Sequence, residues 1–187
     1  AWLDMTINPA KSVCLRICPN WKSTPVNIST LDGTEIVWQQ SCRYLGIYIV
    51  AGRVFSCSLD NAKRSFYRAF NAIYCKVGGV ASEEVVLHLV KSKCMPLLLY
   101  GTEAIPLKKA QIRSVEYAIT SCFMKLFKTK SKEIVCECMS YFDFCDFCTC
   151  VVRRKRKFLL KFAANFCSNE LCCVFVDTAK AELNSLS

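Results

Sequence analysis

The stretch Cys42–Val50, which reads Cys-Arg-Tyr-Leu-Gly-Ile-Tyr-Ile-Val, decides how the first third of the chain is expected to fold. Its β-branched and aromatic residues are those that strands favour. A similar run, Glu35–Trp38, precedes it, and the polar residues Gln39–Ser41 separate the two. Two strand-like runs joined by a short polar break predict a β-hairpin. Upstream, the apolar run Val13–Ile17 predicts one more strand.

From Ser58 onward, apolar residues recur every three or four positions instead of every second one. This period places them on one face of a helix, which the pair Gly78-Gly79 is expected to end. The change of period predicts an α+β chain, with a small antiparallel β-hairpin or sheet edge at the N-terminus and a helical bundle after it. The apolar face consists of Leu59, Ala62, Phe66, Ala69, Phe70, Ile73 and Val77.

Five further helices are predicted downstream. Ser82 is expected to cap the first of them, and Pro96 must bend or end it, because proline lacks the backbone N–H that a helix needs. The second follows Pro106, and Ser131 opens the third. The last two are expected over residues 151–166 and 177–186.

Composition narrows the class of protein. The chain has 187 residues, 53% of them hydrophobic, and a formal net charge of +10. The hydrophobic fraction argues against disorder, and the basic excess favours nucleic acid over an anionic membrane as partner; the alternative is an ordinary solvated surface. Ala1–Asp4 does not resemble a secretory leader and the longest apolar run is short. We therefore expect no membrane and an intracellular location, cytoplasmic or nuclear.

The chain contains 15 cysteines, an odd number, and most stand singly inside apolar patterns. A buried free cysteine behaves as a small hydrophobic residue. We therefore expect reduced thiols, not the disulfide framework of a small secreted domain.

A cluster of cysteines between residues 136 and 150 raises the question of a metal site. Cys145-x-x-Cys148 has the spacing that starts a tetrahedral zinc site, but no second pair follows at a suitable distance. The only histidine, His88, lies in an apolar segment that is predicted to be helical. No metal site is therefore predicted, although the pattern leaves metal binding by this cluster open.

Four segments, taken together, resemble a known family. They are Trp2–Arg16, which contains Asn-Pro-Ala-Lys-Ser at Asn8–Ser12, the Asp32-Gly33 turn, Arg43–Gly46 (Arg-Tyr-Leu-Gly) and Leu99–Gly101. In this order they resemble the end of the palm and the thumb of the reverse transcriptase of non-LTR (LINE- or jockey-like) retrotransposons, over roughly residues 2–165. The resemblance implies an RNA-directed DNA polymerase, a nucleotidyltransferase of transposable elements that uses Mg²⁺ and holds an RNA/DNA template–primer duplex.

In that family, the aspartates that hold the catalytic metals lie upstream of these segments, and this sequence contains no Asp-Asp pair. The resemblance thus implies a fragment that holds template and primer, has no cofactor of its own and is inactive alone. Its implied partners are the template–primer duplex and the upstream palm and fingers of the polymerase, which this sequence does not contain. The implied parts are the end of the palm with a primer-grip-like hairpin, residues 1–55, a helical thumb-like region, residues 56–142, and a basic, cysteine-rich helical extension, residues 143–187.

The resemblance also assigns roles to residues of the first part. Lys11 would contact the phosphates of the incoming nucleotide, and Arg43, Tyr44 and Gly46 would hold the 3′ end of the primer. Glycine lets another strand approach closely, arginine can pair with phosphate, and tyrosine can pack beneath the sugar. The alternatives are a solvated loop lysine and a core hairpin in which Tyr44 and Leu45 are buried.

Cations of two predicted helices complete the candidate nucleic-acid-binding residues. Lys63, Arg64 and Arg68 lie off the apolar face of the helix after Ser58, where contacts to phosphate would position a duplex without reading its sequence. The run Arg153–Lys157 is either a nucleic-acid patch or a nuclear-import signal, and the alternative is a solvated helix face. The candidates in this run are Arg153, Arg154 and Lys155.

Two other hypotheses stay open. One is a small basic helical module without polymerase ancestry, which would bind nucleic acid or an acidic protein through Arg153–Lys157. The other is a decayed copy of an element, suggested by Cys18 in a turn-like segment and by the cysteines between residues 136 and 150. A reading frame with a Tyr/Phe-Ala-Asp-Asp segment shortly before Ala1 would favour the polymerase.

Overall fold

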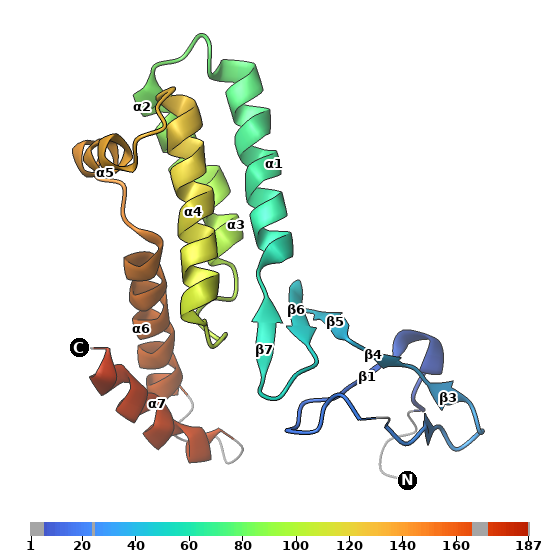
Figure 1. Cartoon of the computed structure of the whole chain (residues 1–187). Helices are drawn as coiled ribbons and strands as arrows, with labels where there is room; N and C mark the ends of the chain where they lie inside the picture. The colour runs from blue at the N-terminus through green and yellow to red at the C-terminus, as the bar shows by residue number, and fades with distance from the viewer. Residues whose placement is uncertain (1–5, 24, 166–171, 187) are drawn as a thin grey trace. The chain divides into compact units, whose positions relative to one another are not determined.

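The computed structural model describes residues 6–23, 25–165 and 172–186 (Figure 1). The chain divides into two compact units, Ala1–Leu59 and Asp60–Ser187. Short strands make up most of the regular structure in the first unit, and helices make up that of the second. This arrangement confirms the predicted α+β class.

Two pairs of short strands lie in the first unit. β1 (Cys14–Leu15) pairs in parallel with β4 (Trp38–Gln39), and β2 (Ile28–Ser29) pairs antiparallel with β3 (Glu35–Ile36). The predicted Asp-Gly turn lies between β2 and β3, where Gly33 has a φ of 81°. Glycine adopts this conformation without steric cost, so the turn is confirmed.

The hairpin predicted on either side of Gln39–Ser41 is wrong. β5 (Ser41–Tyr44) and β6 (Ile47–Val50) form a hairpin with each other, and β7 (Ser56–Ser58) extends it to three strands. Its turn is Leu45-Gly46, with φ angles of 47° and 83°. Two-residue turns with positive φ match the twist of antiparallel strands, so the chain reverses inside the run that the sequence predicted as one strand.

In the second unit, α1 (Asp60–Val77) confirms the first predicted helix and its apolar face. Phe66 and Phe70 are 0% and 2% exposed. The helix ends at Gly78, whose N–H donates to the carbonyl oxygen of Tyr74 at 2.9 Å. The apolar period therefore identified both the helix and the side that it buries.

A continuous helical run follows α1 and changes its winding in the middle. α2 (Glu83–Leu89) passes into a π-helical segment, η2 (Val90–Cys94), which passes into α3 (Met95–Leu99). Pro96 stands in the first turn of α3. Proline has no N–H to donate, and the wider π turn just before it accommodates the missing hydrogen bond. Pro96 thus interrupts the regular α-helix, as predicted, through a change of winding.

The two predicted serine caps differ. Ser131 accepts a hydrogen bond at its Oγ from the N–H of Ile134 at 3.4 Å, and this cap of α5 (Lys132–Tyr141) is confirmed. Ser82 precedes α2 in an extended conformation, but its side chain makes no capping hydrogen bond. Only its carbonyl oxygen serves the helix, by accepting from the N–H of Val86 at 3.1 Å.

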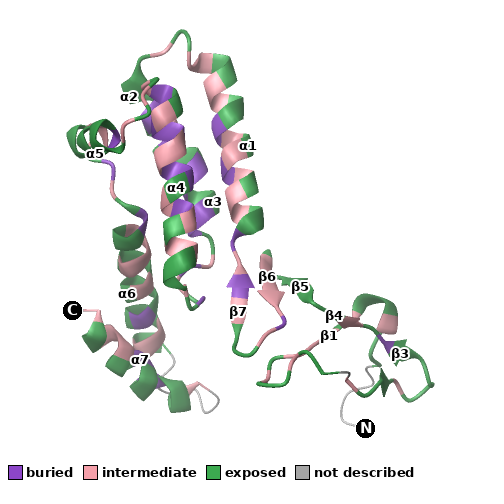
Figure 2. Cartoon of the chain, viewed as in Figure 1, coloured by how far each residue is buried: buried purple, intermediate pink, exposed green. Residues whose placement is uncertain are grey.

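α1 contacts both α3 and α4 (Lys109–Leu126), and each of these three helices carries buried residues (Figure 2). Among the helices that the structure describes, none combines the length and the apolar character that a membrane span needs. Buried residues of α4 are Val115, Ala118, Ile119, Cys122, Phe123 and Leu126.

α6 (Phe147–Asn165) and α7 (Cys173–Ser185) pack against each other and begin earlier than the predicted residues 151 and 177. At the start of α6, Asp146 Oδ2 accepts from the N–H of Thr149 at 2.9 Å. An aspartate in this position satisfies a backbone donor of the first turn. Because Asp146 caps the helix, α6 begins at Phe147, four residues before the predicted start.

Candidate nucleic-acid interface

Arg64 and Arg68 lie on the side of α1 opposite the buried Phe66 and Phe70. Both arginines are exposed, and within residues 6–23, 25–165 and 172–186 neither side chain has an ion-pair or hydrogen-bond partner. Four residues along a helix correspond to about 6 Å of axis. Like charges at this spacing repel by a few tenths of a kcal/mol, and a polyanion on this face would relieve that repulsion.

Lys63, the third predicted cation of α1, has a different role. Its Nζ donates to Ser114 Oγ on α4 at 2.8 Å and lies 2.9 Å from Asp60 Oδ1. The side chain is 24% exposed. Lys63 therefore links two helices of the bundle. Its ammonium group is already bound to Ser114 and Asp60, so it is less available to bind phosphate than the guanidinium groups of Arg64 and Arg68.

Lys125 of α4 adds a cation that is not among the residues predicted from the sequence. Its Nζ donates to Asn71 Oδ1 on α1 at 2.9 Å and lies 5.0 Å from the ring centroid of Tyr74. A cation at this distance from an aromatic face is attracted by it. Asn71 belongs to the same exposed side of α1 as Arg64 and Arg68. These three residues form a polar strip on α1, which Lys125 extends onto α4.

Tyrosines accompany these cations where α1 meets α4. Burial raises the pKa of Tyr67, and a hydrogen bond with Ser121 of α4 opposes this shift. Tyr117 of α4 is 64% exposed. The sequence did carry a signal for this strip, because Tyr67 and Tyr74 are seven residues apart and so share one side of a helix. Mixed cations and aromatic rings suit nucleic acid, whose phosphates and bases they can contact.

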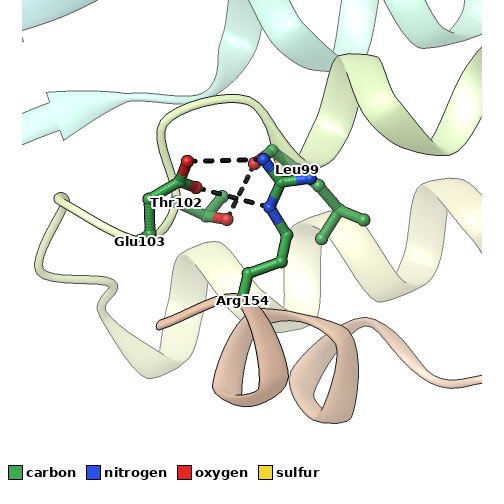
Figure 3. A network of polar contacts seen from close by, with 4 residues as sticks. All are labelled: Leu99, Thr102, Glu103 and Arg154. Atoms are coloured by element: carbon green, nitrogen blue, oxygen red, sulfur yellow. Dashed lines mark hydrogen bonds and ion pairs between the residues drawn. The ribbon is translucent and has the colours of Figure 1, made fainter. Parts of the chain in front are cut away.

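Arg154 of α6 forms an ion pair with Glu103 of the same unit. Its Nη2 and Nε lie 3.3 and 3.4 Å from the two carboxylate oxygens of Glu103, in the loop after α3. In the same loop, the buried Thr102 donates from its Oγ1 to the carbonyl oxygen of Leu99 at 2.9 Å. Figure 3 shows Arg154 reaching from α6 to this loop. The paired, two-point contact fixes α6 against the end of α3.

The other predicted cations of α6 are divided as well. Lys155 pairs with Glu182 of α7, and Arg153 lies 3.8 Å from the Sγ of Cys145 through its Nη2. Arg156 and Lys157 are exposed and have no ion-pair partner among the described residues. The basic run therefore holds the C-terminal helices together with some of its charges and presents the others to solvent.

The hairpin tip of the first unit is exposed. Tyr44 and Leu45 are 63% and 72% exposed, and Arg43 and Gly46 beside them are exposed as well. The alternative of a core hairpin with both residues buried is therefore wrong. An aromatic ring and a cation at a glycine turn can approach a nucleic-acid end closely.

Lys11 is exposed in the short 3₁₀ helix η1 (Pro9–Lys11), which Asn8 caps by accepting from the N–H of Ala10 at 3.0 Å. The cap fixes the backbone from which Lys11 extends. The structure leaves both interpretations of Lys11, phosphate contact and solvated loop lysine, as they stand.

Metal ligands are not clustered in the described part of the chain, and Cys94 and Cys122 are thiols buried in the core. In the described part of the chain, no group of three or more histidine, cysteine, aspartate or glutamate side chains is placed to hold a metal ion. Burial raises the pKa of Cys94 to about 11 and that of Cys122 to about 12. Both are free thiols in the core, and protonated thiols are poor nucleophiles and poor metal ligands.

Comparison of the chain with models of protein families, with curated proteins and with solved structures found no match. The functional argument therefore depends on the residues themselves, above all on the exposed side of α1 and its continuation onto α4.

Proposed function

We propose that this chain holds a nucleic-acid duplex by its phosphates, as the end of the palm and the thumb of a non-LTR retrotransposon reverse transcriptase would. The observation that carries the proposal is the exposed pair Arg64 and Arg68. They stand on one side of a helix whose other side anchors it in the core. A surface that clasps a duplex needs this combination of free cations and a rigid support.

The spacing of the two arginines suits a phosphate backbone. They are separated by about 6 Å along α1, whereas each strand of a B-form duplex carries a phosphate about every 3.4 Å of its axis. The two guanidinium groups can therefore reach different phosphates of one strand. The four segments that resemble the reverse-transcriptase family, from Trp2–Arg16 to Leu99–Gly101, independently support the same function.

The family's magnesium chemistry does not fit the residues present. A two-metal site needs clustered carboxylates, and the sequence has no Asp-Asp pair, nor does the described part contain a cluster that could hold a metal. Under this proposal, the chain binds template and primer but does not extend the primer. Its partners would be the palm and fingers of such a polymerase, and its place of action the cytoplasm or nucleus.

Duplex binding can be tested by charge reversal with a matched control. Affinity for a short labelled RNA–DNA hybrid is measured over a range of KCl concentrations for the wild type and for Arg64→Glu/Arg68→Glu. Each lost phosphate contact lowers the slope of log K against log salt by about 0.9, so the double variant should bind more weakly and lose about 1.8 from the slope.

The control variant is Lys130→Glu/Lys132→Glu, which changes the net charge equally at two exposed lysines near the start of α5. Its slope should stay close to that of the wild type. Equal losses in both variants would mean that net charge alone drives binding, and an unchanged slope in the arginine variant would eliminate this side of α1 as the contact.

The second candidate function is a basic interaction module that uses α6. The exposed Arg156 and Lys157 favour it, but Arg154 and Lys155 are committed to Glu103 and Glu182. Reversal of both free charges, in Arg156→Glu/Lys157→Glu, separates the two candidates in the same assay. If this variant loses more affinity than the α1 variant, the α6 module is the better description.

A further inference from the structure

A small cleft with two tryptophans lies within the first unit, apart from every residue assigned above. Its volume is about 260 Å³. Pockets for drug-sized ligands are typically about 300–1,000 Å³, so this cleft suits one flat group and not an extended ligand. The lining residues are Arg16, Trp21, Lys22, Ser23, Pro25, Trp38, Gln39, Gln40 and Ala51.

Hydrogen bonds fix one wall of the cleft. Trp38 lies on β4, which pairs with β1, and its Nε1 donates to the carbonyl oxygen of Val26 at 3.2 Å. With its only polar atom satisfied, the indole contributes ring surface to the cleft. A rigid aromatic surface binds a flat partner at a low cost in conformational entropy.

Arg16 fixes another part of the lining. Its Nη1 donates to the carbonyl oxygen of Ser23 at 2.9 Å, and its Nε lies 3.2 Å from the Sγ of Cys18. The backbone of Cys18 is itself tied to Gly52, because its N–H donates to the Gly52 carbonyl oxygen at 3.1 Å. The loop that carries Trp21 is therefore held in place without a ligand.

The chemistry of the lining selects for an anionic, aromatic ligand. Lys22 Nζ lies 5.5 Å from the ring centroid of Trp21, which puts a positive charge beside an aromatic face. Among the described residues, no acidic side chain lines the cleft, while Gln39 and Gln40 supply amide donors and acceptors. A nucleotide combines the matching parts, since a base can stack on an indole, its edge can bond with an amide, and its phosphate can pair with a lysine.

We infer that this cleft binds one unpaired base of a single-stranded nucleic acid. Paired bases do not enter, because their edges and faces are already used in the duplex. The inference is independent of the duplex-holding function proposed for α1, since it concerns other residues, another unit and another state of the nucleic acid.

Tryptophan fluorescence provides a direct readout. The chain contains three tryptophans, Trp2, Trp21 and Trp38, so in the variant Trp2→Phe the two indoles of the cleft are the only tryptophans. Excitation at a wavelength that tyrosine does not absorb then follows these two indoles alone. Short oligothymidylate should quench this emission saturably. An abasic oligonucleotide of the same length carries the same phosphates without bases, and we expect it to bind at least about fivefold more weakly, the smallest loss expected for one stacked base.

Two further variants locate the contact. In the Trp2→Phe background, Trp21→Ala should weaken oligothymidylate binding by about 5- to 150-fold, the range reported by alanine substitution for one stacked base. Lys22→Gln removes the charge of an exposed side chain, and it should reduce the salt dependence of binding. Arg64→Glu/Arg68→Glu should leave the quenching unchanged.

Three outcomes would overturn the inference. Equal affinity for abasic and thymidine oligonucleotides would show that no base is bound. Loss of quenching in Arg64→Glu/Arg68→Glu would show that oligothymidylate is bound by the cations of α1 and not by the cleft. Unchanged binding by both Trp21→Ala and Lys22→Gln would exclude the cleft as the binding site. This result would not bear on the duplex proposal, which the salt dependence of the Arg64→Glu/Arg68→Glu variant tests separately.

Discussion

Replacing Lys63 by alanine should destabilise the second unit and leave its duplex affinity unchanged. The substitution removes a hydrogen bond from a charged donor to Ser114 Oγ, 2.8 Å long, and such bonds contribute about 1.5–3 kcal/mol. It also removes the contact with Asp60, but that carboxylate side chain is 68% exposed, so solvent screening limits its share to well under about 1 kcal/mol. We therefore expect the free energy of unfolding to fall by about 2 kcal/mol.

Urea unfolding followed by circular dichroism measures this loss. With a typical denaturant dependence of about 2 kcal/mol per molar urea, the midpoint should fall by about 1 M. Ser114→Ala removes the same hydrogen bond from the other side. The double variant should therefore lose much less than the sum of the two single losses, because both substitutions delete one shared contact.

Arg64→Ala is the matched control, since it removes a neighbouring cation that has no partner within the described residues. Its midpoint should shift by less than the equivalent of about 0.5 kcal/mol, while the slope of duplex affinity against salt falls by about 0.9. The opposite pattern would refute the reasoning. If Lys63→Ala keeps its midpoint and flattens the salt slope, Lys63 contacts phosphate and does not link α1 to α4.

Two further predictions concern a turn and the buried thiols. Gly46→Ala should destabilise the β5–β6 hairpin by about 1–2 kcal/mol, because Gly46 has a φ of 83° that residues with a Cβ adopt at that cost; faster hydrogen exchange of the hairpin amides would report it. Gly52→Ala is its control, since a Cβ there finds only an ordinary contact at 3.5 Å, and equal effects would contradict the turn argument. Stability should also fall as the pH rises from about 9 to 11. Unfolded thiols ionise near the reference pKa of 9.0, whereas burial raises the pKa of Cys94 to about 11 and that of Cys122 to about 12, so the unfolded state loses protons first and is favoured. Urea midpoints at several pH values should show this fall, and Cys122→Ala should reduce it; the same fall in that variant would count against the thiol.

The helices could be predicted from the sequence because the information that specifies them is local. The apolar residues of α1 recur at helical spacing, and Gly78 follows the last of them. Phe66 and Phe70 accordingly face the core. The start of α5 at Ser131 is just as local, since the serine caps an N–H three residues away. Such signals need no knowledge of the rest of the fold.

The strands could be predicted only in part, because their pairing depends on distant partners. β1 and β4 pair in parallel although more than 20 residues separate them, and two-residue strands carry almost no periodic signal. The hairpin was misplaced for a different reason. Turns of this kind are recognised by an Asn-Gly or Asp-Gly pair, and here the pair is Leu45-Gly46. Because leucine rarely adopts the positive φ that Leu45 has, nothing in the sequence indicated a turn at this point.

The candidate interface shows the same limit for charged side chains. Lys63 and Arg64 are adjacent cations, and the sequence gives no reason to assign them different roles. They differ because Lys63 contacts Ser114, which is 51 residues away along the chain. Arg154 is likewise tied to Glu103 across 51 residues. No local pattern reveals which cation a fold will occupy, whereas the exposure of Arg64 and Arg68 follows directly from their position on the helix opposite the apolar face.

Net charge alone therefore overstates the surface that can meet a polyanion. Of the six helical cations predicted to bind nucleic acid, Lys63, Arg154 and Lys155 pair with acidic side chains of the same chain. A cation that already has a carboxylate partner must give up that partner to bind phosphate, and the cost offsets most of the gain. Arg64 and Arg68 have no carboxylate partner among the described residues and so have no such contact to give up. If the proposed function is right, the salt dependence of duplex binding should reflect a few phosphate contacts centred on α1, far fewer than the formal charge of +10 would allow.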